Sequence, residues 1–197
     1  MNVIRKQSYL AVGILLLSGG PVLADGLSYS YIQAGYQDVS IDLGNGPDID
    51  GDGYSVAGSV AIADDWFIFA GYSALEFESI VDLDQLSVGG GYHSAISSKT
   101  DWYATLAYLD ASLDADFLGS ADDSGYGVSV GLRSMVSPSL ELYGSVAYSD
   151  LGDGIDGTAF GAGLWYNVSG NLALGLGASL DEDATSYGVG LRLYFDK

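Results

Sequence analysis

A regular alternation of large and small side chains is the feature that most limits what this chain can fold into. In residues 172–180, leucines alternate with alanine, glycine and serine, and residues 124–135 and 185–195 repeat the pattern. Successive side chains of a β-strand point to opposite faces of the sheet, so each stretch predicts a strand with one large apolar face and one face of small residues.

The small face decides which side meets water. A soluble sheet buries its large apolar residues and covers its outer face with charged and bulky polar groups. The small face here is mostly glycine, alanine and serine, and the whole chain has 29 Gly but only 6 Lys and Arg. Such residues fit the crowded interior of a narrow barrel. The large apolar face is therefore expected to contact lipid, where only a closed barrel satisfies the backbone of every strand.

The alternation predicts an all-β fold, namely a transmembrane antiparallel up-and-down β-barrel of ten strands. The approximate strands are residues 27–38, 54–63, 66–76, 83–93, 101–110, 124–135, 140–149, 157–167, 171–180 and 185–195. An even number of strands brings both termini to one side, which we expect to be the periplasm. The short breaks belong to the same side, and the longer, acid-rich breaks are expected outside the cell.

Aromatic residues support this registration because they recur at the strand ends. Tyrosines stand at the outer ends of seven predicted strands: Tyr36, Tyr54, Tyr72, Tyr108, Tyr126, Tyr148 and Tyr187. A second set stands at the opposite ends: Trp66, Tyr92, Trp102, Tyr166 and Phe195. Two aromatic rings about one membrane apart are typical of outer-membrane barrels, whose aromatic side chains lie at the lipid headgroups.

The first 24 residues have the pattern of a cleaved secretory signal. Arg5 and Lys6 precede an apolar stretch over residues 9–17, which Val22-Leu23-Ala24 follows as a cleavage site. We therefore assign residues 1–24 to a signal peptide and residues 25–197 to the barrel, which predicts export to the outer membrane.

Charge and cysteine content exclude several kinds of chemistry. The formal net charge is −20, and removal of Arg5 and Lys6 makes it more negative, so binding to nucleic acid is excluded. The chain has no cysteine, so it has neither disulfides nor thiolate metal sites.

The longer breaks and their borders concentrate the acidic residues. These are Asp38, Asp42, Asp48, Asp50, Asp52, Glu76, Glu78, Asp82, Asp84, Asp110, Asp114, Asp116, Asp122, Asp123, Asp150, Asp153, Asp156, Asp181, Glu182 and Asp183. Carboxylates attract hard cations such as Ca²⁺ and Mg²⁺. Asp48, Asp50 and Asp52 match the opening D-x-D-x-D-G of a calcium loop, although Ser59 replaces its closing glutamate. Two interpretations stay open: acidic loops that serve solvation and repulsion, and loops that bind divalent cations. No other cofactor is expected.

A polar cluster is predicted inside the barrel. Arg133 and Arg192 fall on the inward face near the periplasmic strand ends, and Glu141 falls inward close to Arg133. An inward arginine in a membrane barrel is expected to pair with a carboxylate. The upper lumen is lined by glycine, alanine and serine, which predicts a cup that opens outward above a floor of arginine, glutamate and aromatic residues. The alternative is that these residues simply fill a narrow barrel.

Enzymatic function is not supported. The chain has one histidine, His93, at the periplasmic end of its strand, and we find no clear catalytic partner for it. The glycine repeats do not precede a helix, so they are not phosphate-binding loops. We expect a protein that is not an enzyme.

Two stretches carry a family resemblance. Residues 25–36 (DGLSYSYIQAGY) and 81–92 (VDLDQLSVGGGY) resemble the outer-membrane barrel family regulated by diffusible signal factor. The resemblance implies an outer-membrane barrel that is also shed in outer-membrane vesicles, with links to signalling and biofilm behaviour, and it implies no catalytic or ligand residues. Residues 190–195 resemble the terminal signal that the barrel assembly machinery reads during insertion.

Two functions therefore remain. The first is a non-enzymatic barrel for surface interaction and envelope structure, whose partners are lipid, lipopolysaccharide and divalent cations. The second is a narrow channel or outward-open cup for small solutes. One barrel architecture supports either function.

Overall fold

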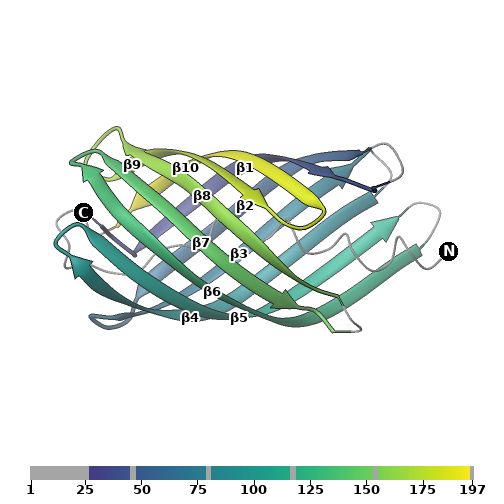
Figure 1. Cartoon of the computed structure of the whole chain (residues 1–197), viewed down its shortest axis with the longest axis horizontal. Helices are drawn as coiled ribbons and strands as arrows, with labels where there is room; N and C mark the ends of the chain where they lie inside the picture. The colour runs from purple at the N-terminus through teal and green to yellow at the C-terminus, as the bar shows by residue number, and fades with distance from the viewer. Residues whose placement is uncertain (1–26, 45–47, 79–80, 116–118, 153–154, 196–197) are drawn as a thin grey trace.

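A computed structural model describes residues 27–44, 48–78, 81–115, 119–152 and 155–195, and these form a closed barrel (Figure 1). The ten strands are β1 (Tyr31–Ile41), β2 (Ile49–Ala61), β3 (Trp66–Phe77), β4 (Val81–Ser97), β5 (Thr100–Ala115), β6 (Gly119–Ser137), β7 (Leu140–Asp150), β8 (Asp156–Asn167), β9 (Leu172–Leu180) and β10 (Ala184–Tyr194). Among the described residues, no helix is long and apolar enough to cross a membrane.

Every strand pairs antiparallel with its neighbours in sequence, and β1 closes the barrel against β10. The β1–β10 ladder runs from Tyr31↔Tyr194 to Ile41↔Ala184. We call the end near Tyr31 and Tyr194 the terminal end, and the opposite end, at the right in Figure 1, the distal end. The predicted antiparallel ten-stranded barrel is confirmed. Its orientation in the membrane stays a prediction, and the predicted signal peptide lies outside the described residues.

Each strand turns its large apolar side chains to the outside and its small side chains to the lumen, as the alternation predicts. Large apolar residues face outward, and Tyr54 and Tyr187 are 69% and 62% exposed. Among the tyrosines at the distal strand ends, the side-chain rings of Tyr36 and Tyr54 lie 5.3 Å apart between their centroids. Tyr92 contacts both Trp66 and Trp102 at the terminal end.

β2, β5 and β6 are longer than predicted because they continue into the acid-rich stretches, whereas β4 gains most of its extra length at the terminal end, where it continues to Ser97. β4, β5 and β6 have 17, 16 and 19 residues. In β5, Ala111 and Ala115 are buried inside while Asp110 and Asp114 are exposed outside. Aspartate disfavours strands and suggested breaks there. The alternation persists through these stretches, however, and cross-strand pairing overrides the local preference.

The start of β1 also differs from the prediction. The first strand begins at Tyr31 rather than at residue 27. Leu27, Ser28 and Tyr29 precede it and are fully buried. These residues turn into the terminal end of the lumen instead of extending the sheet, because apolar and aromatic side chains are available there to cover them.

Candidate functional site: the filled lumen and the outer carboxylates

The terminal end of the lumen contains a buried ion pair. Arg133 donates from Nε to Oε1 of Glu141 at 2.6 Å and from Nη2 to Oε2 at 3.0 Å. Both side chains are fully buried. Glu141 pairs in the ladder with Met135, so it lies diagonally from Arg133 rather than directly opposite. A bidentate contact of this kind is the strongest way to hold a buried arginine.

The second arginine approaches the same carboxylate from another strand. Arg192 Nη1 lies 3.9 Å from Glu141 Oε1, while its Nε and Nη2 donate to Gln33 Oε1 at 2.9 and 2.7 Å. Its guanidinium lies 4.0 Å from the ring centroids of both Tyr31 and Trp165. We call this layer the floor; it comprises Tyr29, Tyr31, Gln33, Arg133, Glu141, Trp165, Arg192 and Tyr194. The structure thus brings together the three residues of the predicted lumen cluster.

The segment before β1 completes the floor. Arg133 Nη1 donates to the carbonyl oxygen of Ser28 at 3.2 Å, and its guanidinium lies 4.4 Å from the ring centroid of Tyr29. The same tyrosine stacks on His93 at 4.3 Å. The segment is therefore held inside the lumen by contacts with β4 and β6.

His93 lies beside a buried carboxylate, Asp101, which the sequence did not reveal as its neighbour. Its Nδ1 lies 3.4 Å from Oδ2 of Asp101, and both residues are buried. Asp101 shares the inward face of β5 with Tyr103. The pair is packed beneath Tyr29 and beside Phe67. The burial of both side chains fits a structural role, in which the pair supports Tyr29 of the floor.

The distal end of the lumen is filled by apolar side chains. We call this cluster the cap; its buried members are Val39, Ile41, Leu75, Phe77, Leu83, Ala111, Leu151, Ile155 and Ala184. They come from β1, β3, β4, β5 and β10 and from the β7–β8 connection, so they meet across the lumen. These apolar side chains lie at the level where the opening of the predicted outward-open cup was expected, and the cup itself stays a prediction. The small residues expected to line an opening lie deeper, and the strand ends beyond them carry large apolar side chains.

Carboxylates form a band on the outer surface, just distal to the tyrosine ring. Strand residues of this outer carboxylate band are Asp38, Asp50, Asp52, Glu76, Asp82, Asp84, Asp110, Asp114, Asp122, Asp150 and Asp156. Tyrosine hydroxyls of the ring donate to three of them: Tyr72 to Asp84 at 2.6 Å, Tyr108 to Asp110 at 3.1 Å and Tyr148 to Asp156 at 3.4 Å. Many acidic residues that the sequence analysis expected in loops thus lie on strands, next to the ring of tyrosines.

The predicted calcium motif lies at the beginning of β2. Asp48 precedes the strand, and Asp50 and Asp52 are exposed within it, opposite Ser40 and Asp38 of β1. A strand spaces alternate carboxylates along one face and does not wrap them around one ion. Within the described residues, no three or more Asp, Glu or His side chains gather as metal ligands. Cation binding by this motif stays a prediction.

The family follows from sequence comparison. Residues 10–167 match the family described as outer membrane protein beta-barrel domain, and the chain belongs to this family. The narrower resemblance to barrels regulated by diffusible signal factor stays a prediction. No curated protein matches the chain.

Several solved structures are similar to this barrel. The translocator domain of autotransporter NalP from Neisseria meningitidis is 12% identical with a TM-score of 0.50, over 87% of this chain and 91% of that one. Neisserial surface protein A is 18% identical with a TM-score of 0.45, over 84% and 96%. The KdgM porin in complex with disordered oligogalacturonate is 12% identical with a TM-score of 0.47, over 84% and 99%. At these identities the likeness concerns the fold alone.

Proposed function

We propose that this outer-membrane barrel is a non-enzymatic envelope protein that acts through its outer surface rather than through its lumen. The observation that carries the proposal is the filling of the lumen at two levels. The floor closes the terminal end with a buried ion pair, and the cap fills the distal end with apolar side chains. A solute path would require both layers to move.

The outer carboxylate band suggests how the surface acts. Phenol groups of a barrel lie at the lipid headgroups, so carboxylates that accept hydrogen bonds from these phenols lie at the level of the phosphates. Tyr72 with Asp84 and Tyr108 with Asp110 are such pairs. Carboxylate and phosphate repel each other unless a hard cation bridges them. The proposed partner is therefore lipopolysaccharide, bound through Mg²⁺ or Ca²⁺.

The test measures retention of lipopolysaccharide by the purified barrel in detergent, with Mg²⁺ or with a chelator. We expect retention in Mg²⁺ and loss with the chelator. The triple variant Asp52→Asn, Asp84→Asn, Asp110→Asn should also lose retention. The matched control is Asp64→Asn, Asp65→Asn, which removes exposed carboxylates at the terminal end. Retention that ignores the chelator contradicts the cation bridge.

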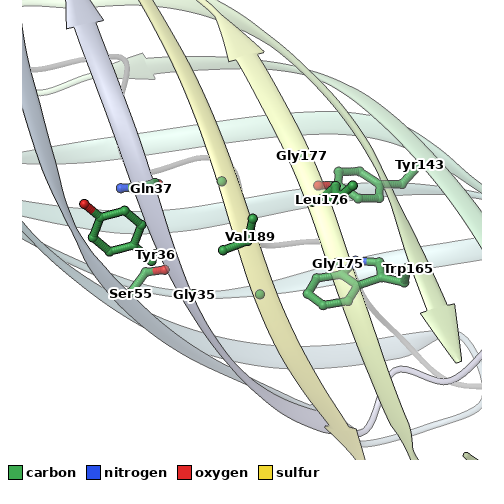
Figure 2. Close-up of a pocket in the computed structure, with 12 residues that line it drawn as sticks. Gly35, Tyr36, Gln37, Ser55, Tyr143, Trp165, Gly175, Leu176, Gly177 and Val189 are labelled. Atoms are coloured by element: carbon green, nitrogen blue, oxygen red, sulfur yellow. The ribbon is translucent and has the colours of Figure 1, made fainter. Parts of the chain in front are cut away.

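A narrow channel is the second candidate, and a small cavity lined by glycines of β1, β9 and β10 (Figure 2) is the observation that favours it. Planar-bilayer recordings distinguish the two candidates. The surface function predicts no steady ohmic conductance from the unmodified barrel. Steady conductance that changes when Arg192 is replaced by alanine would instead establish the lumen as the functional part.

A further inference from the structure

The wall of the barrel is uneven at the distal end, because β6 continues beyond the end of β7. The ladder between β5 and β6 runs to Ala115↔Gly119, whereas the ladder between β6 and β7 stops at Tyr126↔Asp150. Figure 1 shows β5 and β6 reaching farther toward the distal end than β7 and β8. Within the described part of the chain, residues 119–125 of β6 are therefore paired on one side only. We call these residues the free edge.

Two glycines allow β7 to leave the wall at this level. A Cβ at Gly125 would collide with the backbone oxygen of Asp150, so the chain passes close to β6 only because a glycine stands there. Gly152 then adopts a φ of 82°, in the left-handed region that glycine tolerates. Leu151 and Ile155 turn into the cap, and the Leu151 N–H donates to the Ile155 carbonyl oxygen. The backbone hydrogen bonds of the described residues in this connection thus lie within it, and none reaches the free edge.

The free edge is an extended strand with one open hydrogen-bonding side. Its ladder with β5 keeps the backbone extended, and the Ser112 hydroxyl of β5 donates to Asp122 at 2.7 Å. Along the edge, exposed residues alternate with half-buried ones. The unpaired N–H and C=O groups of such an edge are a template for pairing with another chain. A segment that pairs there meets a strand that is already ordered, so less conformational entropy is lost on binding.

The charge around the free edge indicates which kind of segment fits. Asp122 and Asp123 lie in the edge, and Asp110 and Asp114 lie on the neighbouring β5. The one described lysine, Lys99, lies in the turn at the terminal end, and both described arginines are buried in the floor. A second copy of the chain would bring its own aspartates against these, and like charges opposite each other destabilise a strand pair. The edge therefore disfavours a second copy and favours a positively charged strand.

We propose that the free edge is a docking site for an extended segment of a partner protein that is rich in lysine or arginine and adds to β6 as a further strand. Main-chain hydrogen bonds to the edge supply the affinity, and Asp122 and Asp123 supply the preference for a cationic segment, as is general for β-strand addition. Lipopolysaccharide, the partner proposed above, has no peptide backbone to pair with the edge. The site is therefore an additional one.

The test uses the unmodified barrel in a zwitterionic detergent and a fluorescent peptide of alternating lysine and threonine, as long as the free edge. Fluorescence anisotropy measures binding, which we expect to occur. A second peptide has the same side chains and charge but a methyl group on every backbone nitrogen. It should bind more weakly by about tenfold or more, because methylation removes the main-chain donors of the added strand. Equal binding of the two peptides means attraction by charge alone and overturns the proposal, as does no binding of either.

Cross-linking locates the bound peptide. The chain has no cysteine, so Ser124→Cys places a single thiol on the exposed face of the free edge, where a peptide with one cysteine can form a disulfide with it. The matched control is Ser40→Cys on β1, which lies opposite Asp50 but is paired with both β2 and β10. We expect cross-linking to Ser124→Cys and little to Ser40→Cys. Equal cross-linking of the two variants, or none at Ser124→Cys, contradicts docking at the free edge.

Discussion

The floor and the cap fill the same lumen, and they differ in what each requires of its residues. In the floor, Arg133 and Arg192 share Glu141, and a buried charge is tolerated only while its partner is present. In the cap, Leu83 and Phe77 contribute volume and have no polar partner to lose. The floor therefore depends on the identity of each residue, whereas the cap depends on how well space is filled.

The largest effect should come from removing the carboxylate that both arginines face. Glu141→Gln is expected to destabilise the barrel by about 3–5 kcal/mol, because it leaves buried guanidinium groups without a counter-charge. Urea unfolding of the barrel in lipid vesicles measures the change. Glu76→Gln, on the exposed face of β3, should leave the urea midpoint unchanged. Equal effects of the two variants would contradict the comparison.

Truncation of a side chain in the cap should lower the free energy of unfolding by somewhat less. Leu83→Ala is expected to destabilise by about 2–4 kcal/mol, because it leaves a cavity among buried side chains. In the same unfolding experiment, Leu83→Met should cost less than about 1.5 kcal/mol, since it conserves volume. A methionine variant as damaging as the alanine variant would show that the cap requires a particular shape.

A conservative substitution in the floor should lower the free energy of unfolding more than a conservative substitution in the cap. Arg192→Lys is expected to cost about 2 kcal/mol, because lysine cannot donate twice to Gln33 while it stacks between Tyr31 and Trp165. The Leu83→Met variant is the reference. If the lysine variant is the more stable of the two, the floor does not require the planar guanidinium.

The smallest effect is expected on the outer surface. Tyr72→Phe removes one exposed hydrogen bond to Asp84. Since solvent replaces such a bond, the urea midpoint should stay the same. A lowered midpoint would mean that the outer carboxylate band stabilises the fold as well as the surface.

The fold was predictable because strand alternation is a local signal that repeats ten times. The lumen cluster followed from the same signal, since Arg133, Glu141 and Arg192 each fall on the inward face. Asp101 could have been found in this way, because it shares the inward face of its strand with Tyr103. Its position as the first residue of the predicted strand 101–110 leaves the direction of its side chain less certain to follow from the pattern than that of Tyr103.

The cap could not be predicted in the same way. Leu151 and Ile155 belong to the β7–β8 connection, and only the folded barrel turns them into the lumen. Leu27 and Tyr29 continue the alternation that β1 follows, yet they leave the sheet because the floor offers buried contacts. Such choices depend on residues far away in the chain, and a local pattern does not contain them.

The contacts of the floor also set the order in which the barrel forms. The hydrogen bonds from Arg192 to Gln33 join residues 159 apart in sequence, and the bond from Arg133 to Ser28 joins residues 105 apart. Bringing such distant residues together costs the most chain entropy and slows folding. Hairpins of adjacent strands should therefore assemble early. The contact between Arg192 and Gln33 should therefore form when the seam between β1 and β10 closes, so this arginine joins the two ends of the chain late in folding.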